Sequence, residues 1–131
     1  LIMKYTKRKP YKYRLYADYS YYVDIAALQV SPSEYIKLTQ GYIFIKKGYT
    51  WDGATDPAID TKNFMIGSLV HDALYQLIRE GVIDKDDKDK CDVILRDICL
   101  EQGMSRIRAW WVYQGVKRFG HKAIKSRVIT V

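Results

Sequence analysis

The alternation of apolar and polar positions predicts short β-strands in the first half of the chain. Residues 11–16 and 21–25 are rich in tyrosine, valine and isoleucine, and residues 17–18 can turn the chain between them. Farther along, residues 35–38 and 42–45 flank a Thr-Gln-Gly turn and predict a β-hairpin. We therefore expect a small antiparallel β-sheet in the N-terminal half.

The second half of the chain has the three-to-four-residue period of amphipathic helices. Helices are predicted over residues 61–79, 84–103 and 105–119. Residue types that cap or close helices stand at their ends, namely Asp60 or Thr61, Gly81, Asp84, Gly103, Ser105 and Gly120. The predicted fold class is α+β, in which the sheet is followed by a three-helix C-terminal half.

Length and composition fit one globular domain. The chain has 131 residues, of which 48% are hydrophobic and 14% aromatic, enough for a single core. We expect one domain over residues 1–131, with strands and a site loop in 1–60, helices in 61–121 and a basic tail in 122–131. No apolar run approaches the ~20 residues of a membrane span. The N-terminal charges lack the apolar stretch of a secretory signal peptide, so secretion by that route is not expected.

Charge is distributed unevenly along the chain, whose net charge is +7. Residues 1–14 carry six Lys or Arg and residues 104–131 carry seven, and neither segment has an acid. The middle holds all 15 acids against nine bases. Basic ends suit an anionic membrane surface, an acidic partner protein or nucleic acid, and they can also be simply solvated. Nucleic acid is the least favoured partner, because no recognised nucleic-acid-binding motif is present.

Several aromatic and sulfur-containing side chains have simple interpretations. Seven of the 12 tyrosines fall within residues 5–22, where they can cover a sheet face or grip a protein surface. Trp110 and Trp111 are expected in the core or at the edge of an interface. Cys91 and Cys99 stand about 12 Å apart on one helix, too far for a disulfide, so a reducing compartment is expected.

The strongest candidate for a site is the segment His-Asp-Ala-Leu-Tyr at residues 71–75. His71 and Tyr75 share a helix face with Gly67, whose lack of a side chain lets a neighbouring helix approach. Asp72 lies about 100° around the helix. On the next helix, Asp92 shares a stripe with apolar residues, and such an acid is costly to bury unless it is paired. We expect His71 or Tyr75 to be its partner.

Four interpretations fit these side chains. A neutral His71 held by Asp92 can take a proton from water. Asp72, together with Asp52 or carbonyl oxygens of residues 48–56, can bind a hard cation such as Ca²⁺. Alternatively, the histidine and the two helical aspartates can ligate a transition metal. The fourth interpretation is a buried hydrogen-bond network that only fixes the packing of the helices.

The order of these motifs resembles a phage and bacterial family known only as a domain of unknown function (number thirteen-fifty-three). The resemblance is carried by residues 52–57 (Asp-Gly-Ala-Thr-Asp-Pro), 71–75, 91–92 and the pattern Tyr-x-x-Val-x-x-Phe-Gly at 113–120, and it spans about residues 42–120. It implies a phage or prophage origin, with a location in the virion or the host cytoplasm. It implies no particular activity.

A looser resemblance concerns chemistry. The pattern His71-Asp72-x-x-Tyr75 on one helix, with Asp92 on a following helix, is similar to the active site of phospholipase A2. That resemblance implies that His71 is a general base, that Asp72 binds Ca²⁺, and that Asp92 and Tyr75 orient the histidine. The chain departs from that pattern because the glycine-rich calcium loop is replaced by residues 48–56, which have only two glycines, and the disulfides of secreted forms are missing.

Two hypotheses follow. The first is a phage-encoded hydrolase of an ester or phospholipid, with His71, Asp92 and Tyr75 as catalytic residues. Asp72 and Asp52 are then the ligands of Ca²⁺ or another divalent cation. The second is a non-catalytic phage protein, either a virion component of the tail, baseplate or neck, or a factor that binds host proteins. Its partners would be phage structural or host proteins, and its histidine network would be structural.

Overall fold

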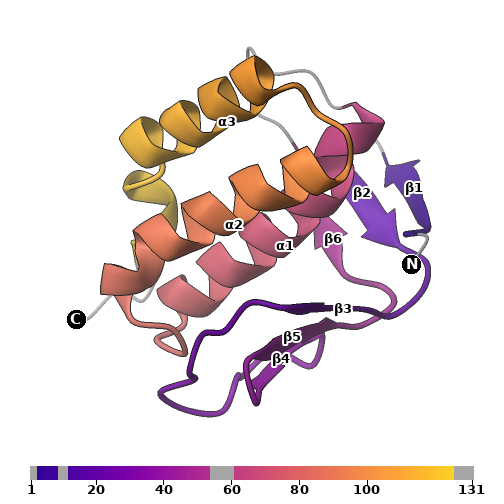
Figure 1. Ribbon diagram of the computed structural model, residues 1–131. Coiled ribbons are helices and arrows are strands. Elements are labelled where there is room, and N and C mark those ends of the chain that lie inside the picture. Colours follow the sequence, from indigo (N-terminus) through magenta and orange to yellow (C-terminus); the bar gives the residue numbers. More distant parts are fainter. Residues whose placement is uncertain (1–2, 9–11, 54–60, 126–131) are drawn as a thin grey trace.

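Strands occupy the first half of the chain and helices the second, as Figure 1 shows. The computed structural model describes residues 3–8, 12–53 and 61–125. The strands are β1 (Tyr5–Arg8), β2 (Lys12–Leu15), β3 (Tyr19–Tyr22), β4 (Ile36–Thr39), β5 (Tyr42–Ile45) and β6 (Thr50–Trp51). The helices are α1 (Lys62–Arg79), α2 (Lys88–Glu101) and α3 (Arg106–Phe119), with short 3₁₀ turns η1 (Lys85–Asp87) and η2 (Lys122–Ile124). The α+β prediction is confirmed.

The strands form two antiparallel sheets, where one small sheet was predicted. One sheet has the order β1-β2-β6 and the other has the order β3-β5-β4. Residues 17–18 therefore do not close a hairpin but carry the chain from the first sheet to the second. Asp18 supports this crossing, because its Oδ1 accepts a hydrogen bond from the backbone N–H of Lys47 at 2.8 Å. The two-residue strand β6 completes the first sheet by pairing Trp51 with Tyr13.

The predicted hairpin is present as β4 and β5. Gln40 and Gly41 form its turn with φ angles of +50° and +81°, the positive pair that a tight two-residue hairpin turn requires. Burial alternates along both strands, so that one face of the hairpin is covered and the other is exposed. The covered face contributes Ile36, Leu38, Ile43 and Ile45 to the core.

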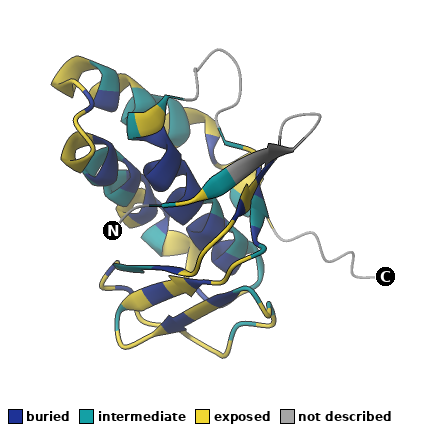
Figure 2. Ribbon diagram, turned by 90° about the vertical axis from the view of Figure 1, so that its right-hand side faces the viewer, coloured by how far each residue is buried: buried dark blue, intermediate teal, exposed yellow. Residues whose placement is uncertain are grey.

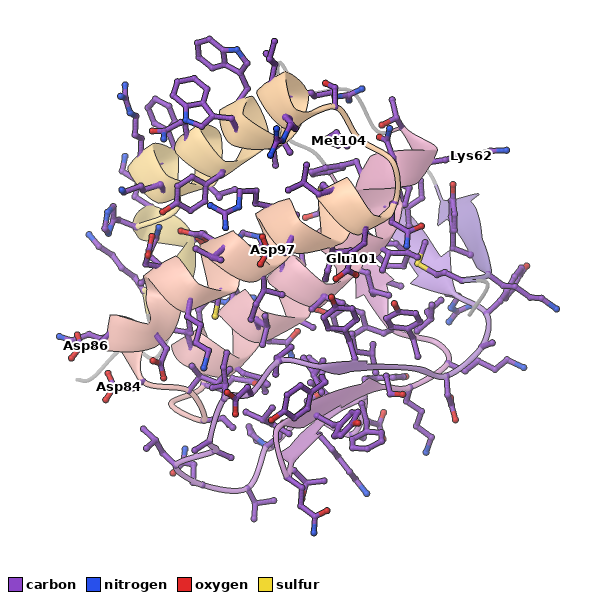
Figure 3. The ribbon with its side chains drawn as sticks, in the orientation of Figure 1. Lys62, Asp84, Asp86, Asp97, Glu101 and Met104 are labelled. Atoms are coloured by element: carbon purple, nitrogen blue, oxygen red, sulfur yellow. The ribbon has the colours of Figure 1, made fainter. Side chains whose placement is uncertain are left out.

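The helix ends lie close to the predicted positions. Asp84 caps η1 by accepting a hydrogen bond from the backbone N–H of Asp86 at 2.9 Å. Both side chains lie near the N-terminal end of α2 in Figure 3. Ser105 caps α3 by accepting from the N–H of Arg108 at 3.2 Å. Thr61 occupies the N-cap position of α1 without a side-chain capping bond. The alternative cap Asp60, residues 54–56 of the predicted site loop and residues 126–131 of the basic tail lie outside the described residues.

Helix α1 lies at the centre of the structure. The strands lie along one side of it, α2 packs on the other, and α3 lies beyond α2 (Figure 1). Figure 2 shows the buried positions concentrated where the helices meet each other and the strands. Within the described part of the chain, no helix is both long and apolar enough to cross a bilayer. Large side chains that are almost fully buried include Leu15, Ile43, Leu69, Leu74, Leu77, Leu95 and Ile98.

The structure tests the interpretations of the cysteines and of the tryptophans. Cys91 and Cys99 are buried free thiols, as expected from their spacing. Trp110 and Trp111 are not in the core, because 50% and 65% of their surfaces are exposed. Trp111 lies on the side of α3 opposite Ala109, which is buried against α2. The core alternative for the tryptophans is therefore wrong, and the edge of an interface stays a prediction.

Gly67 allows α1 and α2 to approach closely, as its position predicted. A Cβ atom at this position would lie 2.9 Å from Cδ1 of Leu95, 3.2 Å from Sγ of Cys99 and 3.3 Å from the carbonyl oxygen of Leu95. Leu95 and Cys99 are fully enclosed, so neither can move away without disturbing other contacts.

We predict that Gly67→Ala lowers the free energy of unfolding by about 1 kcal/mol, because overpacking of about 1–3 kcal/mol outweighs a gain in helix propensity of about 1 kcal/mol. Gly115→Ala is the matched control, since a Cβ on that helical glycine meets nothing within 4 Å. It should be neutral or stabilising. Urea denaturation of both variants measures the difference, and equal stabilities would contradict the close approach.

Candidate functional site

The structure brings together three of the five predicted site residues. His71 and Tyr75 lie one turn apart on α1, and Asp92 faces them from α2. Oδ1 of Asp92 lies 2.8 Å from Nε2 of His71 and accepts a hydrogen bond from the Tyr75 hydroxyl at 2.5 Å. The imidazole and phenol rings also pack together, with centroids 4.0 Å apart. The predicted pairing of Asp92 with His71 or Tyr75 is confirmed for both.

Lys88 completes the network and was not predicted. Its Nζ donates to Oδ2 of Asp92 at 2.7 Å and to the carbonyl oxygens of Val116 at 3.0 Å and Lys117 at 3.4 Å. The side chain of Lys88 is only 8% exposed. The signal in the sequence was the four-residue spacing between Lys88 and Asp92 on one helix, which is typical of an ion pair. A lysine is rarely buried, so this spacing alone does not indicate a buried ion pair.

Gly120 provides the space that the network needs at the end of α3. A Cβ atom at this position would lie 2.4 Å from the Tyr75 hydroxyl oxygen and 3.1 Å from Cε of Lys88. Gly120 is itself buried. The sequence indicated only that this glycine ends a helix, and its second role depends on the packing of α3 against the other helices.

The hydrogen bonds determine the charges within the network. Burial would raise the pKa of Asp92, but the hydrogen bonds from His71, Lys88 and Tyr75 outweigh burial and lower that pKa. Burial lowers the pKa of His71, even though the Asp92 carboxylate acts in the opposite direction. Burial, with a smaller effect of the bond to Asp92, raises the pKa of the Tyr75 hydroxyl. At neutral pH the site therefore holds the Asp92 carboxylate, a neutral imidazole and a protonated phenol.

These charges define the tautomer of His71. A carboxylate can only accept hydrogen bonds, so the imidazole donates through Nε2–H and its lone pair is on Nδ1. The His71 side chain is 7% exposed, whereas that of Asp92 is fully enclosed. His71 is thus held in one orientation by a buried carboxylate.

Asp72 lies on a different face of α1, in a polar stripe with Ser68 and Gln76 at four-residue spacing. This stripe faces β6 and the residue before it. Ser68 Oγ accepts a hydrogen bond from Nε1 of Trp51 at 3.0 Å, and Oε1 of Gln76 accepts one from the Tyr49 hydroxyl at 3.1 Å. Burial and then the nearby charge of Asp72 raise the pKa of Tyr49. Asp72 is itself half-buried.

The predicted cation ligands do not form a complete site among the described residues. Asp52 follows β6 and is exposed, whereas Asp72 is half-buried on α1. In the described ranges, no three His, Cys, Asp or Glu side chains gather as metal ligands. The predicted transition-metal set of His71, Asp72 and Asp92 is thus not assembled. Residues 54–56 of the predicted loop lie outside the described residues.

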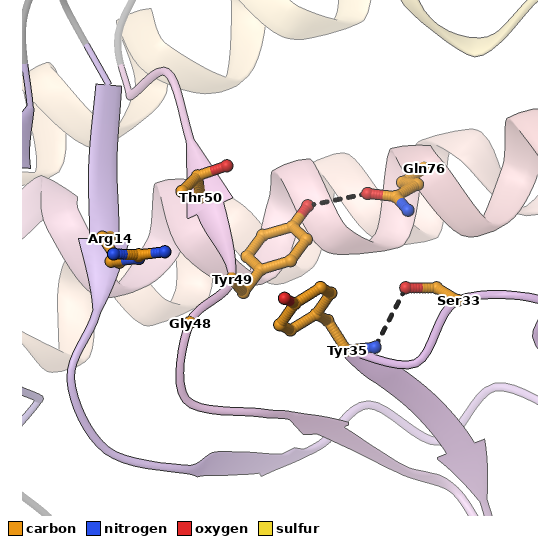
Figure 4. A pocket seen from close by; sticks show the side chains of 7 residues that line it. All are labelled: Arg14, Ser33, Tyr35, Gly48, Tyr49, Thr50 and Gln76. Carbon is orange, nitrogen blue, oxygen red and sulfur yellow. Dashed lines mark hydrogen bonds between the residues drawn. The ribbon is translucent and has the colours of Figure 1, made fainter.

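A pocket of about 350 Å³ lies beside the polar stripe (Figure 4). Arg14 of β2, Tyr35 and Tyr49 contribute to its wall, together with Gln76 of α1. None of the residues of the His71 network lines this pocket. The pocket and the network therefore lie on different faces of α1.

The chain belongs to the family described as "Protein of unknown function (DUF1353)", whose model matches residues 28–116. The match begins earlier than the predicted residue 42 and stops before Gly120. It includes His71, Asp92 and the newly found Lys88. No curated protein matches the chain. No solved structure matches it either.

We predict that His71 makes the protein less stable as the pH falls through about 6.5, the pKa of an exposed histidine. The pKa of His71 is lowered in the folded state, so the unfolded chain takes up the proton first and is favoured by acid. The expected loss is about 1 kcal/mol between about pH 7.5 and about pH 5.5. Asp92, whose folded-state pKa is also lowered, adds to this loss only below about pH 4.

Urea denaturation across this pH range tests the assignment. In His71→Gln, the loss between the two pH values should largely disappear. His121→Gln is the matched control, because His121 is the other histidine of the chain and its side chain is exposed. This control should keep the parent's pH dependence, and a His71→Gln profile identical to that of the parent would contradict the assignment.

Proposed function

We propose that this protein is a hydrolase of esters, including phospholipid esters, in which His71 is the general base. One observation supports this proposal above the others. The Asp92 carboxylate lies 2.8 Å from Nε2 of His71, and this contact leaves the basic lone pair on Nδ1 of a neutral imidazole. A base of this kind is suited to proton abstraction near neutral pH.

The proposed reaction begins with a water molecule hydrogen-bonded to Nδ1 of His71. The imidazole takes its proton while the water oxygen forms a bond to the ester carbonyl carbon. The imidazolium then lies next to the Asp92 carboxylate, which stabilises its positive charge. When the carbon–oxygen bond to the alcohol breaks, His71 returns the proton to the leaving oxygen.

Asp92 and its other partners position the base. Asp92 orients the imidazole through Nε2, while Tyr75 and Lys88 hold the carboxylate from its two sides. In this proposal Asp92 and Tyr75 act through His71 and have no contact with the substrate. In sites that pair a nucleophile with a base, a third residue often sets the tautomer and orientation of the base. Asp92 has that role in this proposal.

We predict that His71→Gln lowers kcat by about a hundredfold or more, because a general base contributes about 10²–10⁴ in rate. The assays use a p-nitrophenyl ester and vesicles of phosphatidylglycerol. Tyr75→Phe keeps the base and removes one bond to Asp92, so it should lower kcat less than His71→Gln does and should shift the pH profile.

His121→Gln should keep the parent's rate, and circular dichroism should show that His71→Gln is folded. A parent protein that hydrolyses neither probe would overturn the proposal. Equal rates for the parent and a folded His71→Gln variant would do the same.

A divalent cation at Asp72 is a separate proposal, and no step of the reaction above is routed through it. Carboxylate oxygens suit Ca²⁺, and in this proposal Asp72 and Asp52 are its ligands. We predict that Ca²⁺ raises the melting temperature, since saturation at about a hundredfold excess over Kd contributes about 2.7 kcal/mol. Asp72→Asn should abolish the rise, whereas Asp86→Asn, at an exposed acid near α2, should keep it. An unchanged melting temperature with any divalent ion would contradict this proposal.

A second candidate function is that of a non-catalytic phage protein whose network only joins the helices. It is favoured by the saturation of Asp92, both of whose oxygens accept hydrogen bonds, from three side chains in all. Such a protein would act in the virion or the host cytoplasm, with phage or host proteins as partners. The two candidates predict different effects of His71→Gln. Under this alternative the variant is less stable than the parent, and neither protein hydrolyses esters.

A further inference from the structure

The outward face of α3 carries large apolar side chains that nothing in the described structure covers. Ile107 is 74% exposed, Trp110 50%, Trp111 65% and Phe119 82%. The two indole rings contact each other edge to face, with centroids 5.0 Å apart. Four such residues on a 14-residue helix are more than the scattered apolar side chains that soluble surfaces normally show.

The orientation of α3 explains this exposure. The helix is anchored by the buried Ala109, with Val112 and Val116 partly buried beside it. Ile107 and Trp111 are four residues apart and lie on the opposite side of the helix. Figure 1 shows that α3 is the outermost helix, with α2 between it and α1. The apolar face therefore points away from the rest of the molecule.

The same part of the chain is positively charged. Between Met104 and Lys125 there are six Lys or Arg residues and no acid. Arg106, Lys117, Arg118 and Lys122 are exposed. The surface thus combines indole rings and an aliphatic side chain with flanking cations, which is the composition of helices that lie in the plane of a membrane interface.

We infer that α3 docks on an anionic membrane surface. Tryptophan rings favour the headgroup region, because they have an apolar body and one polar N–H. Ile107 would enter the acyl boundary, and the Lys and Arg side chains would contact lipid phosphates. A second copy of this chain fits less well, because two such faces would bring like charges together. The inference rests on α3 and the turn that follows it, and it does not depend on the hydrolase proposal.

The test measures binding to vesicles of phosphatidylcholine, with and without phosphatidylglycerol, by co-sedimentation and by tryptophan emission. Binding should require the anionic lipid, should weaken with added salt and should shift the emission to the blue. Trp51 is buried and changes little. The double variant Trp110→Gln/Trp111→Gln should bind about tenfold more weakly. Arg106→Gln and Arg118→Gln should each weaken binding roughly fivefold.

Matched controls distinguish binding through α3 from nonspecific hydrophobic binding and from catalysis. Phe44→Gln replaces an aromatic residue that is 42% exposed on β5, and it should bind as the parent does. His71→Gln should also bind normally, so that a failure of the hydrolase proposal is distinguishable from a failure of this one. The inference is overturned by equal binding of parent and tryptophan variant, by a dimer that the tryptophan variant dissociates, or by tighter binding to duplex DNA than to anionic vesicles.

Discussion

The buried carboxylate of Asp92 is the constraint on which the arrangement of the helices depends. A charge that is removed from water is costly unless hydrogen-bond donors surround it. Here the donors come from α1 through His71 and Tyr75 and from α2 itself through Lys88. The lysine also needs acceptors, and it finds them in the last turn of α3. The hydrogen bonds that stabilise the Asp92 carboxylate and its partner Lys88 thus require all three helices in their observed positions.

Helix α1 transmits this constraint to the strands. Its face toward α2 carries the network, while its polar stripe bonds through Ser68 to Trp51 and through Gln76 to Tyr49. These side-chain bonds set the position of β6, and β6 in turn completes the first sheet by pairing with β2. The orientation of His71 is consequently supported from both sides of the helix.

The parts of the structure that depend on local sequence were predictable, and the parts that depend on distant contacts were not. The turn of the β4–β5 hairpin, the cap at Ser105 and the pairing of Asp92 follow from residue types and helical spacing. The division into two sheets does not, because the two-residue β6 has no pattern of its own and is defined by its partner β2. Lys88 and Gly120 were missed for the same reason, since their roles exist only once three helices are packed.

The network also has an evolutionary consequence. The three donors share one carboxylate. Replacing Asp92 with an apolar residue would leave the buried ammonium of Lys88 without its carboxylate partner. Replacing Lys88 alone would remove one of the hydrogen bonds that stabilise the Asp92 carboxylate. Substitutions at these positions are therefore strongly coupled, and their energetic effects should not add. A lineage can exchange the polar cluster for an apolar one only through several concerted changes, including at Gly120, whose missing side chain gives the Tyr75 hydroxyl its space.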